Sequence, residues 1–119
     1  MASKNIAIGN SEVLIMGYTF KEDCNDTRDT QVKKLIECLK EFNINIFLND
    51  PFINSIGFDF VKLINPFKEM KQFDSIIICV AHEEYKSRSL SDWENLCKEN
   101  YLIMDIKNIL PNSPNIIKI

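Results

Sequence analysis

Two cations, Lys21 and Arg28, stand in a polar stretch between an apolar segment and a segment with helical spacing. An arginine can hold a phosphate or carboxylate through two parallel hydrogen bonds, while a lysine acts as a movable point charge. Together they could bind a small anionic molecule. A plainer interpretation is equally open, in which Arg28 pairs with Asp26 to brace the loop and Lys21 is solvated.

Other polar side chains follow the ends of predicted strands: Asp50, His82, and Asp105 with Lys107. The carboxyl ends of parallel strands share one edge of a sheet, and ligands bind in a crevice there. We therefore expect these residues to lie along the same edge as Lys21 and Arg28. For His82 we expect a structural role, donating to a backbone carbonyl, because a general base needs a partner carboxylate and a substrate within reach.

The four cysteines are not expected to carry chemistry. No Cys-x-x-Cys pair occurs and the sequence has one histidine, so no zinc site is predicted. Cys38, Cys79 and Cys97 fall in a predicted helix, strand and helix, where small buried residues belong. Cys24 is in the loop, where the neighbouring acids disfavour a reactive thiolate.

Alternating strands and helices position these residues. We predict apolar strands at 12–18, 45–48, 58–64, 75–80 and 101–105, with a short last strand at 115–119. A helix with its apolar face at Val32, Leu35, Ile36, Leu39 and Phe42 follows the loop and ends at Asn43. Further helices are expected at 66–72 and at 91–100, the latter opened by a capping box at 91–94. This order predicts an α/β, three-layer, Rossmann-like domain: an open, mostly parallel sheet of five to six strands with helices on both faces.

Composition narrows the class of protein. The 119 residues predict one domain, with 1–11 as a lead-in and 12–119 as the folded unit. A formal charge of −3 argues against general nucleic-acid binding. No signal peptide and no bilayer-spanning apolar run are visible, so a cytoplasmic protein without membrane contact is expected. With three glycines, the sequence holds neither a glycine-rich dinucleotide fingerprint nor a P-loop.

The loop resembles a known signature. Gly17-Tyr-Thr-Phe-Lys-Glu-Asp-Cys-Asn-Asp-Thr-Arg28 is similar to the Gly-x-x-Phe-Lys-x-x-x-x-Asp-x-Arg motif that opens the C-terminal, UDP-binding domain of the UDP-glucose/GDP-mannose dehydrogenase family. Three later segments agree in order: 49–52 (Asn-Asp-Pro-Phe), 80–82 (Val-Ala-His) and 105–108 (Asp-Ile-Lys-Asn). The cysteine before Asn-Asp-Thr-Arg looks most like the branch that oxidises UDP-N-acetylhexosamines for polysaccharide synthesis.

The resemblance implies roles for matched positions. Phe20 and Lys21 would contact the UDP-sugar, and Arg28 would reach the NAD bound on a neighbouring domain. Lys107 stands where many relatives carry an arginine that contacts the substrate from a neighbouring subunit, so a homo-oligomer is implied for the full-length enzyme. Lysine keeps the charge there but loses the bidentate fork.

The resemblance also implies partners outside this sequence. Family enzymes oxidise the sugar C6 alcohol to a carboxylate with NAD, using an N-terminal Rossmann domain and a central segment that holds the catalytic cysteine. This sequence contains neither the glycine-rich fingerprint of that Rossmann domain nor the loop that holds the catalytic cysteine. The chain alone is therefore expected to be inactive as a dehydrogenase. Two alternatives stay open: a stand-alone α/β binding module in the manner of a receiver domain, and a dimerisation unit that binds no nucleotide.

Overall fold

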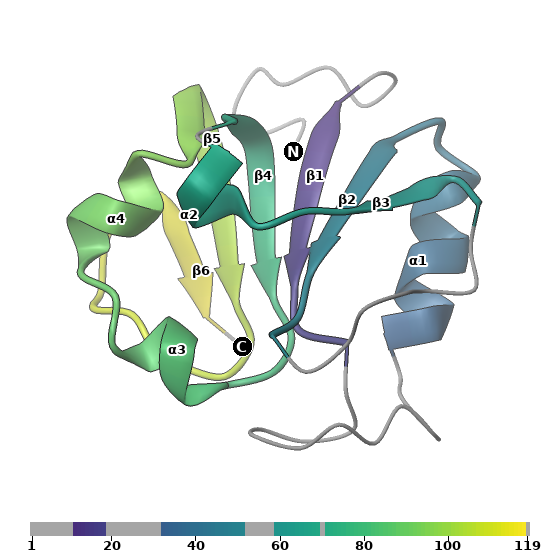
Figure 1. The fold of residues 1–119 in the computed structure, drawn as a ribbon. Coiled ribbons are helices and arrows are strands. Elements are labelled where there is room, and N and C mark those ends of the chain that lie inside the picture. Colours follow the sequence, from purple (N-terminus) through teal and green to yellow (C-terminus); the bar gives the residue numbers. More distant parts are fainter. Residues whose placement is uncertain (1–10, 19–31, 52–58, 70, 119) are drawn as a thin grey trace.

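A parallel β-sheet forms the middle of the molecule (Figure 1). The structure is a computed structural model that describes residues 11–18, 32–51, 59–69 and 71–118. Within these residues six strands pair in the order β3-β2-β1-β4-β5-β6, and every pairing is parallel. The strands are β1 (Glu12–Met16), β2 (Asn45–Asn49), β3 (Val61–Leu63), β4 (Phe73–Ile78), β5 (Cys97–Asp105) and β6 (Ile116–Lys118).

Helices cover both faces of the sheet, which confirms the predicted three layers. Helix α1 (Val32–Lys40) lies on one face, and α2 (Pro66–Glu69), α3 (Glu83–Lys86) and α4 (Leu90–Glu94) lie on the other (Figure 1). The longest of them has nine residues, and no helix in the described part of the chain has the length and apolar character needed to cross a membrane.

Alternation along β1 divides the core in two. Val13 and Ile15 pack with α1, whereas Leu14 and Met16 pack toward the three short helices. Successive side chains of a strand point to opposite faces, so a strand that is apolar throughout requires a cover on both sides. All four side chains are buried, as the continuous apolar run predicts.

Helix α1 is shorter than predicted. It ends at Lys40, and Asn43 takes the expected left-handed conformation with φ 57°. Phe42 therefore lies beyond the helix and is 57% exposed, so its placement on the apolar face was wrong. Cys38 is exposed as well, because residues two apart on a helix point to nearly opposite sides and Ile36 faces the core.

The region 89–105 also differs from the prediction. The capping box is formed by Ser89 and Asp92, two residues earlier than expected, and α4 ends at Glu94. Leu96 then accepts a hydrogen bond from the backbone of Phe73, and the chain continues as β5. Cys97 consequently lies in a strand rather than a helix, although it is buried as predicted. Sheet pairing outweighs helical spacing in this short segment.

Ion pairs join the amino ends of the central strands. The carboxylate of Glu12 binds Lys71 at 2.6 Å and Lys98 at 2.9 Å. Asp74 accepts the backbone N–H of Glu12 at 2.8 Å and lies 3.3 Å from Lys98. The hydrogen bond from Lys71, together with Lys98, lowers the pKa of Glu12 below its ordinary value, against the opposing effect of burial.

This cluster predicts a pH dependence of stability. A depressed carboxyl pKa stabilises the fold above the unfolded pKa and ceases to do so as the pH falls through the folded value. We expect the wild type to lose more stability than Glu12→Gln between about pH 6 and about pH 3, by less than about 1 kcal/mol because the pairs are partly exposed. Urea unfolding across this range measures the difference. Glu37→Gln, on the exposed side of α1, is the control, and its unfolding free energy should change with pH as that of the wild type does. The same change with pH in the wild type and in Glu12→Gln would contradict the prediction.

Candidate functional site

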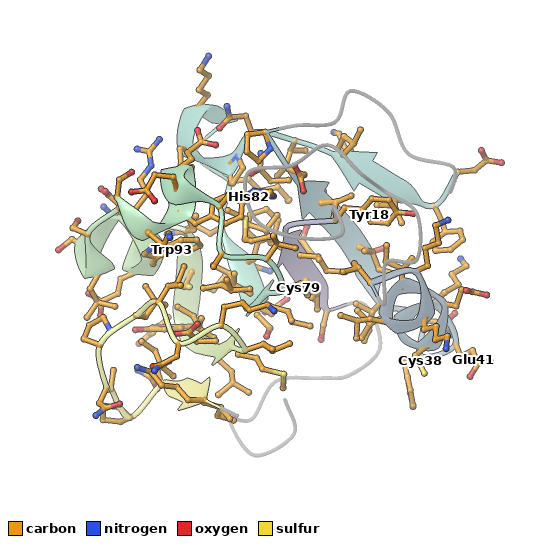
Figure 2. The ribbon with its side chains drawn as sticks, turned by 90° about the horizontal axis from the view of Figure 1, so that it is seen from below. Tyr18, Cys38, Glu41, Cys79, His82 and Trp93 are labelled. Atoms are coloured by element: carbon orange, nitrogen blue, oxygen red, sulfur yellow. The ribbon has the colours of Figure 1, made fainter. Side chains whose placement is uncertain are left out.

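The carboxyl ends of the strands lie in one row at a single edge of the sheet. Met16 is in register with Asn49 on one side and with Ile78 on the other. Ile78 is in register with Asp105, which in turn pairs with Lys118. We call this row and the residues that follow it the carboxyl edge; Figure 2 views the molecule from this side. Asp50, His82, Asp105 and Lys107 share it, as the sequence predicted.

A crevice is expected where the strand order reverses, between β1 and β4. The helices that follow these two strands, α1 and α3, pack on opposite faces of the sheet, which is the arrangement that creates such a crevice in open α/β sheets. Gly17 stands at this point with φ +102°, and a Cβ built on it would lie 2.6 Å from the Cβ of Val80. The backbones can approach this closely because Gly17 has no side chain.

A buried carboxylate lies beside this crossing point. One oxygen of Asp50, Oδ2, accepts the backbone N–H of Tyr18 at 2.8 Å and the Nε2 of His82 at 2.9 Å. The side chains of Asp50 and His82 are both fully buried. A partner carboxylate for His82 is thus present, but a buried imidazole cannot meet a ligand in this conformation, which favours the structural role predicted for it. Figure 2 labels both residues, with His82 nearer the middle of the view and Tyr18 on the side of α1.

A second buried pair was not predicted. The hydroxyl of Tyr85 donates to Asn49 at both its Oδ1 (2.8 Å) and its carbonyl (2.9 Å), and the Asn49 amide donates to the carbonyl of Ile64. Burial raises the pKa of the Tyr85 hydroxyl, so it remains a donor. The available signal was an asparagine closing an otherwise apolar strand, since such a buried amide requires partners.

Lys107 is presented by a turn that Asp105 closes. The two carboxylate oxygens of Asp105 accept the backbone N–H groups of Ile109 and Leu110 at 3.1 and 2.8 Å. Asp105 is buried, whereas Lys107 is exposed at the carboxyl edge. This position is compatible with a ligand contact, and the role of Lys107 stays a prediction.

Two of the described cysteines are poor nucleophiles. Burial raises the pKa of Cys79 to about 12, although the charge of Lys107 opposes the shift. Burial likewise raises the pKa of Cys97 to about 12. Both thiols are therefore protonated near neutral pH. In the parts of the chain that are described, no three His, Cys, Asp or Glu side chains gather as metal ligands.

Three of the four predicted site residues, Phe20, Lys21 and Arg28, lie outside the described residues, as does Cys24. The segment that carries them follows Tyr18, whose backbone N–H donates to Asp50 at the carboxyl edge. Their roles remain predictions.

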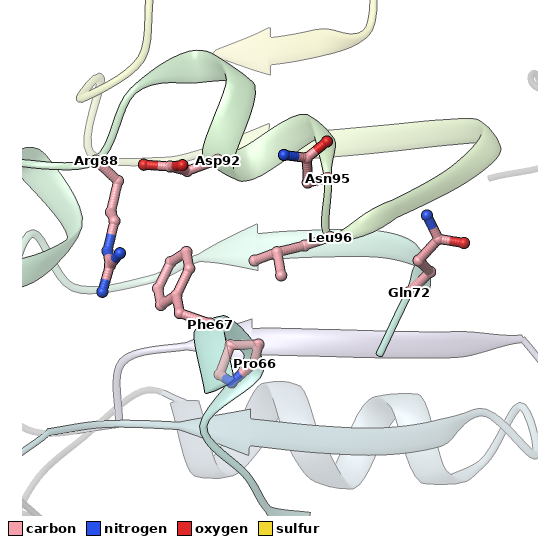
Figure 3. Close-up of a pocket in the computed structure, with 7 residues that line it drawn as sticks. All are labelled: Pro66, Phe67, Gln72, Arg88, Asp92, Asn95 and Leu96. Carbon is pink, nitrogen blue, oxygen red and sulfur yellow. The ribbon is translucent and has the colours of Figure 1, made fainter. Parts of the chain in front are cut away.

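A cavity of about 500 Å³ lies elsewhere (Figure 3). The guanidinium of Arg88 stacks over the ring of Phe67 at 4.0 Å on its wall, while Asp92 is engaged in capping α4. The lining residues are Pro66, Phe67, Gln72, Arg88, Asp92, Asn95 and Leu96. None of these belongs to the carboxyl edge, so the geometry of the fold, rather than this cavity, locates the candidate site.

The strand order, which reverses between β1 and β4, defines a Rossmann-like domain, a class of fold whose ligands bind at the carboxyl ends of the strands. The chain belongs to the UDP-glucose/GDP-mannose dehydrogenase family, whose UDP binding domain matches residues 14–112.

Similar proteins include UDP-N-acetyl-D-glucosamine 6-dehydrogenase of Salmonella typhi, 31% identical over 93% of this chain and 27% of that protein. UDP-N-acetyl-D-mannosamine dehydrogenase of Methanococcus vannielii is 34% identical over 90% of this chain and 25% of its own length. In fold, the chain is similar to NDP-N-acetyl-D-galactosaminuronic acid dehydrogenase from Methanosarcina mazei, with a TM-score of 0.74 and 21% identity over 94% of this chain and 24% of that one. The chain thus spans about a quarter of the length of these proteins.

Gly17→Ala should destabilise the fold by about 2 kcal/mol or more, because it adds both a positive-φ strain and a contact with Val80. Asn43→Ala is the matched control, since Asn43 also has a positive φ but is exposed, and we expect it to cost about 1 kcal/mol. Urea unfolding measures both. Equal losses in the two variants would show that the approach of β1 to β4 is not tight.

Tyr85→Phe should cost about 1 to 3 kcal/mol, because it leaves the buried Oδ1 of Asn49 without the donor that Tyr85 supplies. Tyr101→Phe removes a comparable bond, from the Tyr101 hydroxyl to Glu94, at an exposed site. We expect that control to cost less than about 1 kcal/mol in the same unfolding measurement. A neutral Tyr85→Phe would refute the structural role of the pair.

Proposed function

We propose that this chain binds the UDP part of a UDP-sugar in the crevice between β1 and β4. The observation that carries the proposal is the reversal of strand order at this point, directly before the signature segment 17–28. Unpaired backbone N–H groups and cationic side chains at such an edge favour a diphosphate. The relatives' names support a UDP-N-acetylhexosamine as the sugar class.

Individual roles follow the family signature. We assign Phe20 and Lys21 to the UDP-sugar, with Lys21 supplying charge to the diphosphate. Lys107, exposed on the turn after β5, is assigned to the substrate of a neighbouring subunit in a homo-oligomer. Arg28 is assigned to NAD held by another domain.

NAD itself fits poorly into this chain. The segment after β1 reads Gly17-Tyr-Thr-Phe and lacks the glycine spacing that brings a backbone close to a pyrophosphate, and the side chain of Tyr18 is buried there. We therefore propose that NAD is bound mainly by domains outside this sequence, which also supply the catalytic cysteine. The domain, residues 12–119, would act within a larger, cytoplasmic NAD-dependent UDP-sugar 6-dehydrogenase for polysaccharide synthesis and would have no dehydrogenase activity alone.

In that enzyme the domain would work through binding energy. By binding UDP far from the reacting carbon, the domain can position the C6 alcohol without contacting that alcohol. The high pKa values of Cys79 and Cys97 support a role in binding over one in covalent chemistry.

Calorimetry with UDP and with UDP-N-acetylglucosamine tests the proposal. We expect weak binding by the wild type and a loss of about tenfold or more in Lys21→Ala, because a charged hydrogen bond is worth about 1.5 to 3 kcal/mol. Lys33→Ala, which removes the same charge from the exposed side of α1, should bind as the wild type does. The same affinity in all three proteins would contradict the assignment of Lys21.

A further inference from the structure

Asp50 and His82 are buried polar residues for which the proposed UDP site has no direct use. Each has a side chain with no solvent exposure, so neither can touch a ligand at the crevice. Burial of such a pair costs free energy of hydration, and its hydrogen bonds must compensate for that loss. Its place, directly at the end of β1, indicates what those bonds do.

The pair holds the first residues after β1. The backbone N–H of Gly17 donates to the carbonyl of Asn49 at 2.7 Å, and the next N–H, of Tyr18, donates to Asp50 Oδ2 at 2.8 Å. Two successive N–H groups are thus bound by two successive residues, the last residue of β2 and the first residue after it. The chain leaves β1 in a direction set by the connection that follows the neighbouring strand.

His82 fixes the carboxylate that makes the second of these bonds. Its Nε2 lies 2.9 Å from the same oxygen that Tyr18 contacts. His82 also begins α3: its carbonyl accepts the N–H groups of Tyr85 and Lys86, while its side chain caps no helix N–H. The imidazole is therefore anchored by the helix and is directed at Asp50.

We infer that Asp50 and His82 are positioning residues for nucleotide binding, which orient the chain at Tyr18 and thereby place Phe20 and Lys21. The inference rests on the proposed function. Lys21 is three positions after Tyr18, which limits their Cα separation to about 10 Å, so the direction of the chain at Tyr18 restricts where Lys21 can lie. Precise placement of binding groups depends on supporting hydrogen bonds of this kind.

The chain offers a closely matched control at the opposite edge of the sheet. Asp74 also uses an Oδ2 to accept a backbone N–H of the β1 segment, from Glu12 at 2.8 Å, and pairs with a cation, Lys98. Asp50→Asn and Asp74→Asn therefore make the same chemical change to the same kind of bond. They differ in which end of β1 is released and in burial, since the side chain of Asp50 is fully buried and that of Asp74 is 18% exposed.

The experiment compares UDP affinity by calorimetry in the wild type, Asp50→Asn, Asp74→Asn, His82→Gln and His82→Leu, each at a temperature where circular dichroism shows it folded. We expect Asp50→Asn and His82→Leu to weaken binding about tenfold or more. Asp74→Asn should stay within about threefold of the wild type. So should His82→Gln, whose amide can donate from near the position of Nε2. Equal affinities in the two Asp→Asn variants, or in the two His82 variants, would overturn the inference.

Amide NMR spectra of the same proteins separate this inference from the proposed function. Asp50→Asn should speed hydrogen exchange at the Tyr18 amide and shift the signals of residues 18–28, whereas Asp74→Asn should leave both unchanged. If the wild type binds no UDP, the proposed function of the isolated chain fails, and these spectra still decide the positioning role. Identical signals for residues 18–28 in the wild type and Asp50→Asn would overturn it. If Asp50→Asn does not fold, the two His82 variants answer the same question.

Discussion

The close approach of β1 and β4 at Gly17 and Val80 is the constraint on which the carboxyl edge depends. The two strands are adjacent in the sheet although their last positions in register, Met16 and Ile78, are 62 positions apart in the sequence. The helices that follow them, α1 after β1 and α3 after β4, lie on opposite faces of the sheet. A side chain at Gly17 would collide with Val80 and push the two segments apart where the strand order reverses. The location of the proposed site is thus a property of backbone packing before any side chain contributes.

Buried hydrogen bonds then fix the geometry of that edge. Asp50 with His82, and Asn49 with Tyr85, link the ends of β1 and β2 to α3. Networks of this kind add little net stability compared with apolar packing, but a satisfied network has few alternative arrangements. Such a network suits the proposed binding edge, which would have to hold its shape while these groups stay buried. At the amino ends of the strands, by contrast, Glu12 forms ion pairs that are partly exposed.

The layers, the strand identities and the shared edge could be predicted from the sequence, because continuous apolar runs such as Ile76–Ile78 and polar residues at strand ends are local signals. Errors arose where tertiary contacts decide. The segment after α4 is a strand because it pairs with the backbone at Phe73. Phe42 lies outside the core because α1 ends at Lys40, before this residue. The bond between Tyr85 and Asn49 joins residues 36 apart, so neither residue shows it by its own neighbours.

A domain that contributes only binding energy still has a demanding structural task. Energy gained at a distant diphosphate aids a reaction only if it fixes the substrate's orientation, since uniform binding does not lower the barrier of the chemical step. An edge built on a tight strand crossing and on fully buried hydrogen bonds meets this requirement better than one built on exposed ion pairs, whose long side chains exchange partners with water. The proposed function thus accounts for the arrangement in which the buried polar groups Asn49, Asp50 and His82 gather where β2 and β4 end beside β1, while the ion pairs of Glu12 lie at the opposite ends of the strands.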